Sequence, residues 1–305
     1  MHGPPEPGIA RSTMKRTTAT LIGFTAVLMW ALLALFSAAS GKVPPFQLAA
    51  MTFTIGTLVG VVSWPFRANA VQNLKQNWRV WLLGVAGLFG YHFVYFSAIR
   101  AAPAVEVSLI AYLWPLFLVA FSALLPGEKL KAHHTIGVIM GLAGAALVIS
   151  RGNIAGISDQ FGFGHVLAFA CAFIWSAYSV LSRRFARVPT DVVVGYCFVT
   201  AILSALCHVL FENTVWPGTA TEWLAVLGLG LFPVGLAFYT WDIGVKRGDI
   251  MVLGTASYAA PLLSTLVLLA FGMTAFHWAI AVACLLITGG ALIAAKDMLL
   301  QKKAT

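Results

Sequence analysis

Long stretches without any charged side chain alternate along the chain with short segments that carry charge. Eight of these stretches are close to the roughly 20 residues that a membrane-spanning helix needs, and a ninth is long enough for two helices joined by a hairpin near "FGMTAFHW". The pattern therefore predicts ten transmembrane helices. A closed barrel is excluded, because barrel strands are short and alternate in polarity. The charge-free stretches are 17–41, 43–66, 80–99, 107–127, 132–150, 160–182, 192–211, 223–241 and 250–295.

The composition supports this assignment. The chain of 305 residues is 60% hydrophobic and only 10% charged, whereas a soluble domain carries about 25% charge. We therefore expect an all-α integral membrane protein surrounded by lipids. The four cysteines lie within or near predicted spans and form no CxxC pair, so they predict small buried side chains rather than a metal or redox site.

The net charge of +9 is compatible with nucleic acid binding or with an orientation signal in the membrane, and its distribution decides between them. With the N-terminus inside and ten alternating helices, 16 of the 19 lysines and arginines fall on inner segments, and only Lys42, Arg100 and Arg151 fall outside. Inner loops rich in Lys and Arg are the rule in membrane proteins. We therefore expect cytoplasmic N- and C-termini. Nucleic acid binding is not expected, because the sequence predicts no soluble domain that could carry it.

The two ends of the chain are predicted to lie outside the membrane. Residues 1–16 begin with a Pro- and Gly-rich segment and should form a disordered leader. Met14 begins "MKR" and looks like a natural start, which leaves open whether the residues before it are native. Residues 299–305 should form a cytoplasmic tail.

The second half of the sequence repeats the first. At an offset of 146 residues, "SLIAYLWPL" falls on "GTASYAAPL", and an offset of 145 brings Trp30 onto Trp175. We predict two five-helix repeats, residues 17–150 and 160–298. Because five is odd, the second repeat enters the membrane from the opposite side. Inverted repeats are a known plan of secondary transporters, with the substrate site near the midplane, so this organisation predicts a carrier.

Polar and aromatic side chains recur near the middle of several predicted spans. In "GYHFVYF", Tyr91, His92 and Tyr95 share one helical face. Polar groups at that depth normally face the bundle interior or a water-filled cavity. Pro115 and Pro261 should kink corresponding spans and are candidate hinges. The set expected to line a substrate cavity is Tyr91, His92, Tyr95, Tyr112, Trp114, Pro115, Trp175, Ser257, Tyr258 and Pro261.

Some of these side chains have alternative explanations. A single mid-helix histidine such as His92 is either a hydrogen-bonded structural residue, which we favour, or a proton carrier. Trp30, Tyr178 and Tyr239 are compatible equally with lining the cavity and with packing. A cavity of tyrosine, tryptophan and one histidine suits a substrate with a flat apolar group and a few hydrogen-bonding positions.

The acidic residues indicate what the cavity lacks. All ten lie at or near predicted span ends, and Glu106, Asp242 and Asp249 come closest to the membrane. We therefore expect no buried pair of carboxylates, and hence neither a carboxylate proton relay nor a sodium site. The motifs HExxH, GxSxG and the P-loop are absent, and "GFGH" (162–165) reads as a loop ahead of a span, so we expect no enzyme and no cofactor.

Small residues recur at helical spacing in "GVIMGLAGAAL" and "TGGAL". This spacing predicts close helix packing, either inside the chain or at a dimer contact. We expect a monomer, with a small-molecule substrate and membrane lipids as its partners.

The arrangement resembles the drug/metabolite transporter superfamily, and within it the EamA-type exporters fit best. The resemblance covers about residues 17–298 and rests on the inverted repeats, "LWPLF", "AAPLL", "LLPGEKL" and the glycine-rich fifth and tenth spans. The segment that begins at "GYHFVYF" is similar to the exporters of aromatic amino acids in that group. Ala260 stands opposite Trp114 in the alignment of the repeats, so the cavity should be asymmetric.

The resemblance implies a secondary carrier of the bacterial inner membrane. It would export aromatic and other neutral amino acids by alternating access between the two repeats. Two alternatives stay open at this stage: export of another small metabolite or drug by the same architecture, and an amino acid channel or facilitator.

Overall fold

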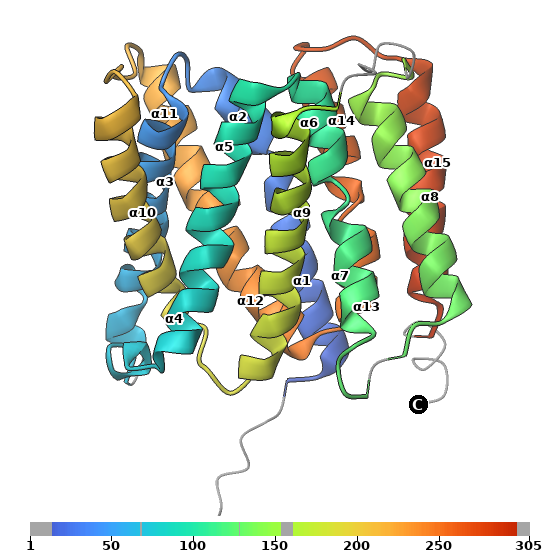
Figure 1. The fold of residues 1–305 in the computed structure, drawn as a ribbon, viewed down its shortest axis with the longest axis horizontal. Helices are drawn as coiled ribbons and strands as arrows, with labels where there is room; N and C mark the ends of the chain where they lie inside the picture. Colours follow the sequence, from blue (N-terminus) through green and yellow to red (C-terminus); the bar gives the residue numbers. More distant parts are fainter. Residues whose placement is uncertain (1–13, 68, 128, 154–160, 298–305) are drawn as a thin grey trace, which may run out of the picture.

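The computed structural model describes residues 14–67, 69–127, 129–153 and 161–297 as helices that stand side by side in one bundle (Figure 1). Across these ranges all regular structure is helical, so the predicted all-α fold is confirmed. Most of the predicted leader, and the whole predicted tail, lie outside the described residues.

Eight helical segments are long and apolar enough to cross a membrane. They are Arg16–Ala39, Pro45–Phe66, Trp78–Ala101, Ala132–Ile149, Phe163–Phe185, Val192–Phe211, Ala220–Arg247 and Ile250–Ala270. Two shorter apolar helices, Glu106–Ser122 and Trp278–Ala294, occupy the other two positions at which the sequence predicts spans.

Several of these segments are interrupted by short turns. The α-helices are α1 (Arg16–Trp30), α2 (Leu33–Ala39), α3 (Pro45–Val62), α4 (Trp78–Val85), α5 (Tyr91–Ala101), α6 (Ala104–Ala111), α7 (Trp114–Ser122), α8 (Ala132–Ile149), α9 (Phe163–Ser182), α10 (Val192–Phe211), α11 (Ala220–Leu231), α12 (Ala237–Arg247), α13 (Ile250–Ala256), α14 (Ala259–Ala270) and α15 (Trp278–Ala294). Between them lie the 3₁₀ turns η1 (Trp64–Phe66), η2 (Gln72–Leu74) and η4 (Arg183–Phe185), and the π-helical turns η3 (Ala86–Gly90) and η5 (Phe232–Leu236).

The helix boundaries repeat along the chain. The first residues of α5, α6 and α8 are 91, 104 and 132, and those of α12, α13 and α15 are 237, 250 and 278, a constant offset of 146. The π-helical turns η3 and η5 show the same offset. Packing repeats as well, since α1 lies against α12 as α9 lies against α5. Because π-helical turns are rare, their recurrence at one offset indicates two copies of one structural unit.

The fourth and ninth predicted spans are each broken near the middle. One break separates α6 from α7, and the corresponding break separates α13 from α14. Pro115 and Pro261 lie in the first turn of α7 and α14, where a proline is tolerated because its missing N–H would have no partner within the helix. The two prolines therefore lie at helix breaks, and hinge motion about them stays a prediction.

At one edge of the bundle, α8 and α15 pack along each other (Figure 1). A Cβ atom on Gly137 would lie 2.5 Å from the Gly290 carbonyl oxygen, and one on Gly290 would lie 2.6 Å from the Gly137 carbonyl oxygen. The two small-residue segments of the sequence analysis therefore pack against each other inside the chain, which decides between the two alternatives left open there.

Gly137→Val should lower the thermal unfolding midpoint of the purified protein in detergent. The added side chain meets backbone that cannot rotate away, and overpacking of this kind costs about 1–3 kcal/mol. Gly90→Ala is the matched control, because a Cβ atom there meets no atom within 4 Å. An unchanged midpoint for Gly137→Val would contradict the close backbone approach.

Candidate functional site

Four tryptophans from four helices meet at the centre of the bundle, and we call them the tryptophan tetrad: Trp30 of α1, Trp114 of α7, Trp175 of α9 and Trp241 of α12. Every pair of these rings is in contact, with centroid distances from 5.1 Å for Trp30–Trp241 to 6.3 Å for Trp114–Trp175. Trp114, Trp175 and Trp241 are buried. Edge-to-face and tilted contacts predominate, as the ring quadrupoles favour.

Beside the tetrad, α5 presents the residues of the "GYHFVYF" segment. The rings of Tyr91 and Tyr95 stack at 6.0 Å with 11° between their planes, and Tyr91 also contacts Trp175 at 5.6 Å. Like Trp30, and unlike the other three tryptophans, both tyrosines are partly exposed. No residue in the described ranges is hydrogen-bonded to the Tyr91 hydroxyl, which therefore remains available to a ligand.

His92 is held by a hydrogen bond to its own helix. Its Nδ1 lies 2.7 Å from the carbonyl oxygen of Leu88, in the π-helical turn η3. Because a carbonyl only accepts, Nδ1 carries the hydrogen, and in the neutral ring Nε2 is then an acceptor. The ring also meets the edges or faces of Phe53 at 5.0 Å and Phe238 at 6.3 Å. This bond supports the structural role for His92; a proton-carrying role stays untested.

The second repeat contributes differently from the sequence expectation. Ser257 is fully buried, and its hydroxyl donates to the carbonyl oxygen of Leu253 in its own helix at 2.7 Å. Tyr258 is also fully buried and packs with Val138 and Ile287, away from the tetrad. Its ring lies over Gly141 of α8, at which any Cβ atom would come within 2.5 Å of the ring.

Of the ten predicted lining residues, the structure thus brings together Tyr91, His92, Trp114 and Trp175, with Tyr95 stacked on Tyr91. Tyr112 is partly exposed and packs at the edge of the cluster that holds Tyr258. Pro115 and Pro261 are buried at the helix breaks. The carbonyl oxygen of Trp114, at the first break, accepts a hydrogen bond from the Ser176 hydroxyl at 2.7 Å.

Sequence reasoning missed three rings at the centre: Trp241, Phe53 and Phe238. Trp241 and Phe238 had a usable signal, since the 146-residue offset that aligns the repeats also places Tyr95 on Trp241 and His92 on Phe238. Phe53 had none, because a phenylalanine in an apolar span is most often packing or lipid contact.

Glu106 lies at the start of α6, at a span end as the sequence predicts, but it does not face water. This residue is buried, and its Oε2 lies 2.6 Å from Nε2 of the equally buried His165. The other ring nitrogen of His165 accepts a hydrogen bond from the Gly162 N–H at 2.9 Å. The "GFGH" segment is therefore the cap and first turn of α9 rather than a plain loop. Its histidine also connects α9 to α6 through Glu106.

Asp242 is a second buried acid, in the middle of α12. Its carboxylate accepts hydrogen bonds from Lys246 at 2.8 Å and from the Thr190 hydroxyl at 2.8 Å. Both members of the ion pair are buried. Asp242 is thus paired with a cation, Glu106 is hydrogen-bonded to an imidazole, and neither belongs to the carboxylate pair that a relay would need. In the ranges that the structure covers, no group of three His, Cys, Asp or Glu side chains could hold a metal ion.

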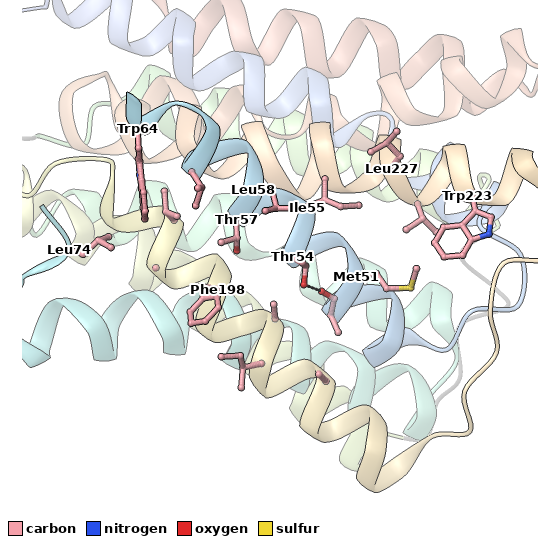
Figure 2. Close-up of a pocket in the computed structure, with 18 of the residues that line it drawn as sticks. Met51, Thr54, Ile55, Thr57, Leu58, Trp64, Leu74, Phe198, Trp223 and Leu227 are labelled. Carbon is pink, nitrogen blue, oxygen red and sulfur yellow. Dashed lines mark hydrogen bonds between the residues drawn. The ribbon is translucent and has the colours of Figure 1, made fainter. Parts of the chain in front are cut away.

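A groove of about 1480 Å³ lies away from the tetrad. It runs over the outside of α3 between α10 and α11, and its walls are apolar (Figure 2). We assign the site to the tetrad and its tyrosines because they combine central position and aromatic surface with the polar groups of Tyr91 and His92. The groove is lined by apolar side chains, with only the indole N–H groups of Trp64, Trp81 and Trp223 and two threonine hydroxyls among them.

A bundle of apolar helices with partly exposed polar aromatics at its centre defines a multi-pass membrane transporter. The EamA-like transporter family model matches twice, over residues 17–150 and 162–295. The chain belongs to this family, and the predicted resemblance and two-copy organisation are confirmed.

Named relatives cover nearly the whole chain. An aromatic amino acid exporter named YddG from Ancylobacter novellus is 56% identical over 282 residues, 92% of this chain and 98% of that protein. The aromatic amino acid exporter YddG of Escherichia coli K12 is 27% identical over 92% of this chain and 97% of its own length. A crystal structure of a protein 56% identical to this chain superposes with a TM-score of 0.87 over 92% of this chain and 98% of that one.

Proposed function

We propose that the protein is a secondary carrier that exports aromatic and other neutral amino acids across the bacterial inner membrane by alternating access. The observation that carries the proposal is the tryptophan tetrad with Tyr91 and Tyr95 beside it, placed where helices of both repeats meet. The 56% identity to an exporter whose name gives this substrate class, over nearly the full length of both chains, supports it.

The chemistry of the site suits an aromatic amino acid. A flat ring can stack on Tyr91 or lie against the indole of Trp175, as rings in proteins prefer offset or edge-to-face contacts. The ammonium and carboxylate groups can be met by the Tyr91 hydroxyl, by Nε2 of His92, and by backbone groups freed at the break between α6 and α7. No unpaired acid is needed for a zwitterion, because its own charges sum to zero.

The topology that we propose has ten spans, two inverted repeats and cytoplasmic ends. The beginning of α1 and the end of α15 lie at the same end of the bundle, as an even number of crossings requires (Figure 1). The inner segments hold 16 of the 19 basic residues, which supports a cytoplasmic position for that end. The equivalent positions Arg100 and Lys246 then fall on opposite sides, as inverted repeats demand.

Alternating access would proceed by exchange between the conformations of the two repeats. The breaks at Pro115 and Pro261 allow the halves of the fourth and ninth spans to pivot. Because α6 and α7 contact α9 while α13 contacts α1, each broken span is packed on the first helix of the other repeat.

The first test is flux of labelled phenylalanine and tryptophan from liposomes that contain the purified protein, with and without a pH gradient. We expect saturable flux that other neutral amino acids inhibit. Insensitivity to the gradient would indicate a facilitator, and flux that does not saturate would indicate a channel. The absence of amino acid flux from protein shown to be folded would remove this substrate class and favour another small metabolite.

A further inference from the structure

The groove outside α3 is unusual in shape for a surface that faces lipid. It encloses about 1480 Å³, with α3 as its floor and α10 and α11 as its walls (Figure 2). Its floor and its walls come from segments more than a hundred residues apart, so the concave surface is a product of the fold rather than of one helix.

The walls of the groove present hydrocarbon almost everywhere. Leu58, Phe198 and Leu224 are exposed along it. The hydroxyls of Thr54 and Thr57 on the floor donate to carbonyl oxygens one turn earlier in α3, at 2.7 Å and 2.8 Å, so these hydroxyls are already satisfied. Apart from the indole N–H groups of Trp64, Trp81 and Trp223, this surface offers a polar ligand no partner, whereas an acyl chain needs none.

The length of the groove fits one leaflet of the membrane. Trp64 and Leu74 lie at one end, and Trp223 lies at the other (Figure 2). Between Met51 and Trp64 the floor rises about 20 Å at 1.5 Å per residue. Half of a hydrocarbon core of about 30 Å is shorter than this. An acyl chain anchored at the Trp64 end would therefore be covered over its whole length.

The charge at the Trp64 end fits a phosphate group. Arg67 follows η1 directly, and Lys75 follows Leu74 of η2. Asp191 holds this loop against α10 by accepting hydrogen bonds from Arg67 at 2.7 Å and from Asn73 at 2.8 Å. Lys75 is exposed, and no acid in the described ranges pairs with it. Its charge is therefore uncompensated beside the mouth of the groove.

We propose that this groove binds one anionic phospholipid, with an acyl chain along α3 and the phosphate at Lys75 and Arg67. The lipid fills the space between α10 and α11 and holds them at their present separation. A second copy of the chain is a poorer occupant. In a two-fold dimer within a membrane, the two basic ends would lie in the same leaflet and face each other, so like charges would repel.

Native mass spectrometry of the purified full-length protein tests this directly. The protein is titrated with phosphatidylglycerol or with phosphatidylcholine of identical acyl chains. We expect one phosphatidylglycerol to be retained preferentially, and Lys75→Gln to weaken its binding by about fivefold, the effect of one cation on an anionic headgroup. Phe198→Ala should weaken binding of both lipids, because it removes part of an apolar wall.

Two variants serve as matched controls. Arg79→Gln removes one positive charge at the same end of the bundle. Arg79 precedes the groove-lining Trp81 by two residues, which is about 200° around α4, so it lies on the face of α4 away from the groove. Phe173→Ala removes a phenylalanine 52% exposed, close to the 54% of Phe198, from α9 outside the groove. Both should bind phosphatidylglycerol like the unmodified protein.

Three outcomes would overturn the proposal. The first is equal retention of the two lipids, and the second is equal loss on Lys75→Gln and Arg79→Gln. The third is a predominant dimer mass that Phe198→Ala converts to monomer, which would assign the groove to a second copy. Each readout is independent of transport, so the result stands whether or not aromatic amino acids are the substrate.

Discussion

Trp114→Ala should reduce the flux of tryptophan and phenylalanine through the reconstituted protein by about tenfold, and that of threonine much less. Trp114 contacts the other three members of the tetrad at 5.7–6.3 Å, and in the proposed carrier its indole contacts the aromatic ring of the substrate. Loss of one such aromatic contact with the substrate removes about 1 kcal/mol or more, and about 1.4 kcal/mol is tenfold. Threonine presents no ring and depends on the polar groups instead.

The measurement is initial flux of each amino acid in liposomes at equal protein content, with the thermal unfolding midpoint recorded for the same preparation. Trp216→Ala is the control, because Trp216 is 63% exposed and stacks only on Trp223 at the rim. It should alter neither substrate's flux. Equal losses of threonine and tryptophan flux in Trp114→Ala would mean that Trp114 packs the core and does not recognise the substrate.

The fold was predictable in outline because lipid permits few solutions. Backbone groups in the hydrocarbon core must be satisfied internally, so an apolar stretch of sufficient length becomes a helix. The breaks at Pro115 and Pro261 could be placed for the same reason, since a proline cannot complete the helical ladder. The π-helical turns η3 and η5 could not be placed, because nothing in "AGLFG" or "FPVGL" distinguishes an i→i+5 turn from an ordinary one.

The sequence predicts an aromatic and polar site near the middle of the spans, but it predicts less well which residues form that site. Depth and a shared face were enough to single out Tyr91 and His92, but contacts between side chains depend on how the two repeats dock. Tyr258 illustrates this. Its ring turns toward α8 because Gly141 leaves room for it there, and no periodicity along its own helix carries that information.

The burial of Glu106 could not be predicted from its position at a span end, for a physical reason. Helix ends that are packed by neighbouring helices stay dry. Glu106 lies in the first turn of α6 and is nevertheless covered, because His165 at the start of α9 closes over it. A hydrogen bond with the His165 imidazole, rather than with water, satisfies the carboxylate.

Asp242→Asn should be among the most destabilising single changes in the protein. Asp242 is 1% exposed and Lys246 is 7% exposed, so both charges are buried. When Asn replaces Asp242, the Lys246 ammonium group stays buried without a counter-charge. Its partners are then the Val188 carbonyl oxygen, at 3.1 Å, and the new amide. Breaking a buried ion pair on one side costs about 3–5 kcal/mol. For a chain of this size we expect the thermal unfolding midpoint to fall by roughly 10 °C.

The double variant Asp242→Asn/Lys246→Met separates this effect from a general sensitivity of α12. Once both charges are gone, no uncompensated ion remains, so the double variant should be more stable than Asp242→Asn alone. Lys131→Met is the surface control. It removes the exposed pair with Asp297, whose pKa the hydrogen bond from Lys131 lowers, and exposed pairs contribute little to stability. If the double variant unfolds at the same temperature as Asp242→Asn or below it, the buried lysine is not the source of the instability. The loss would then lie in the hydrogen bond that Thr190 donates to the Asp242 carboxylate, which ties the start of α10 to α12.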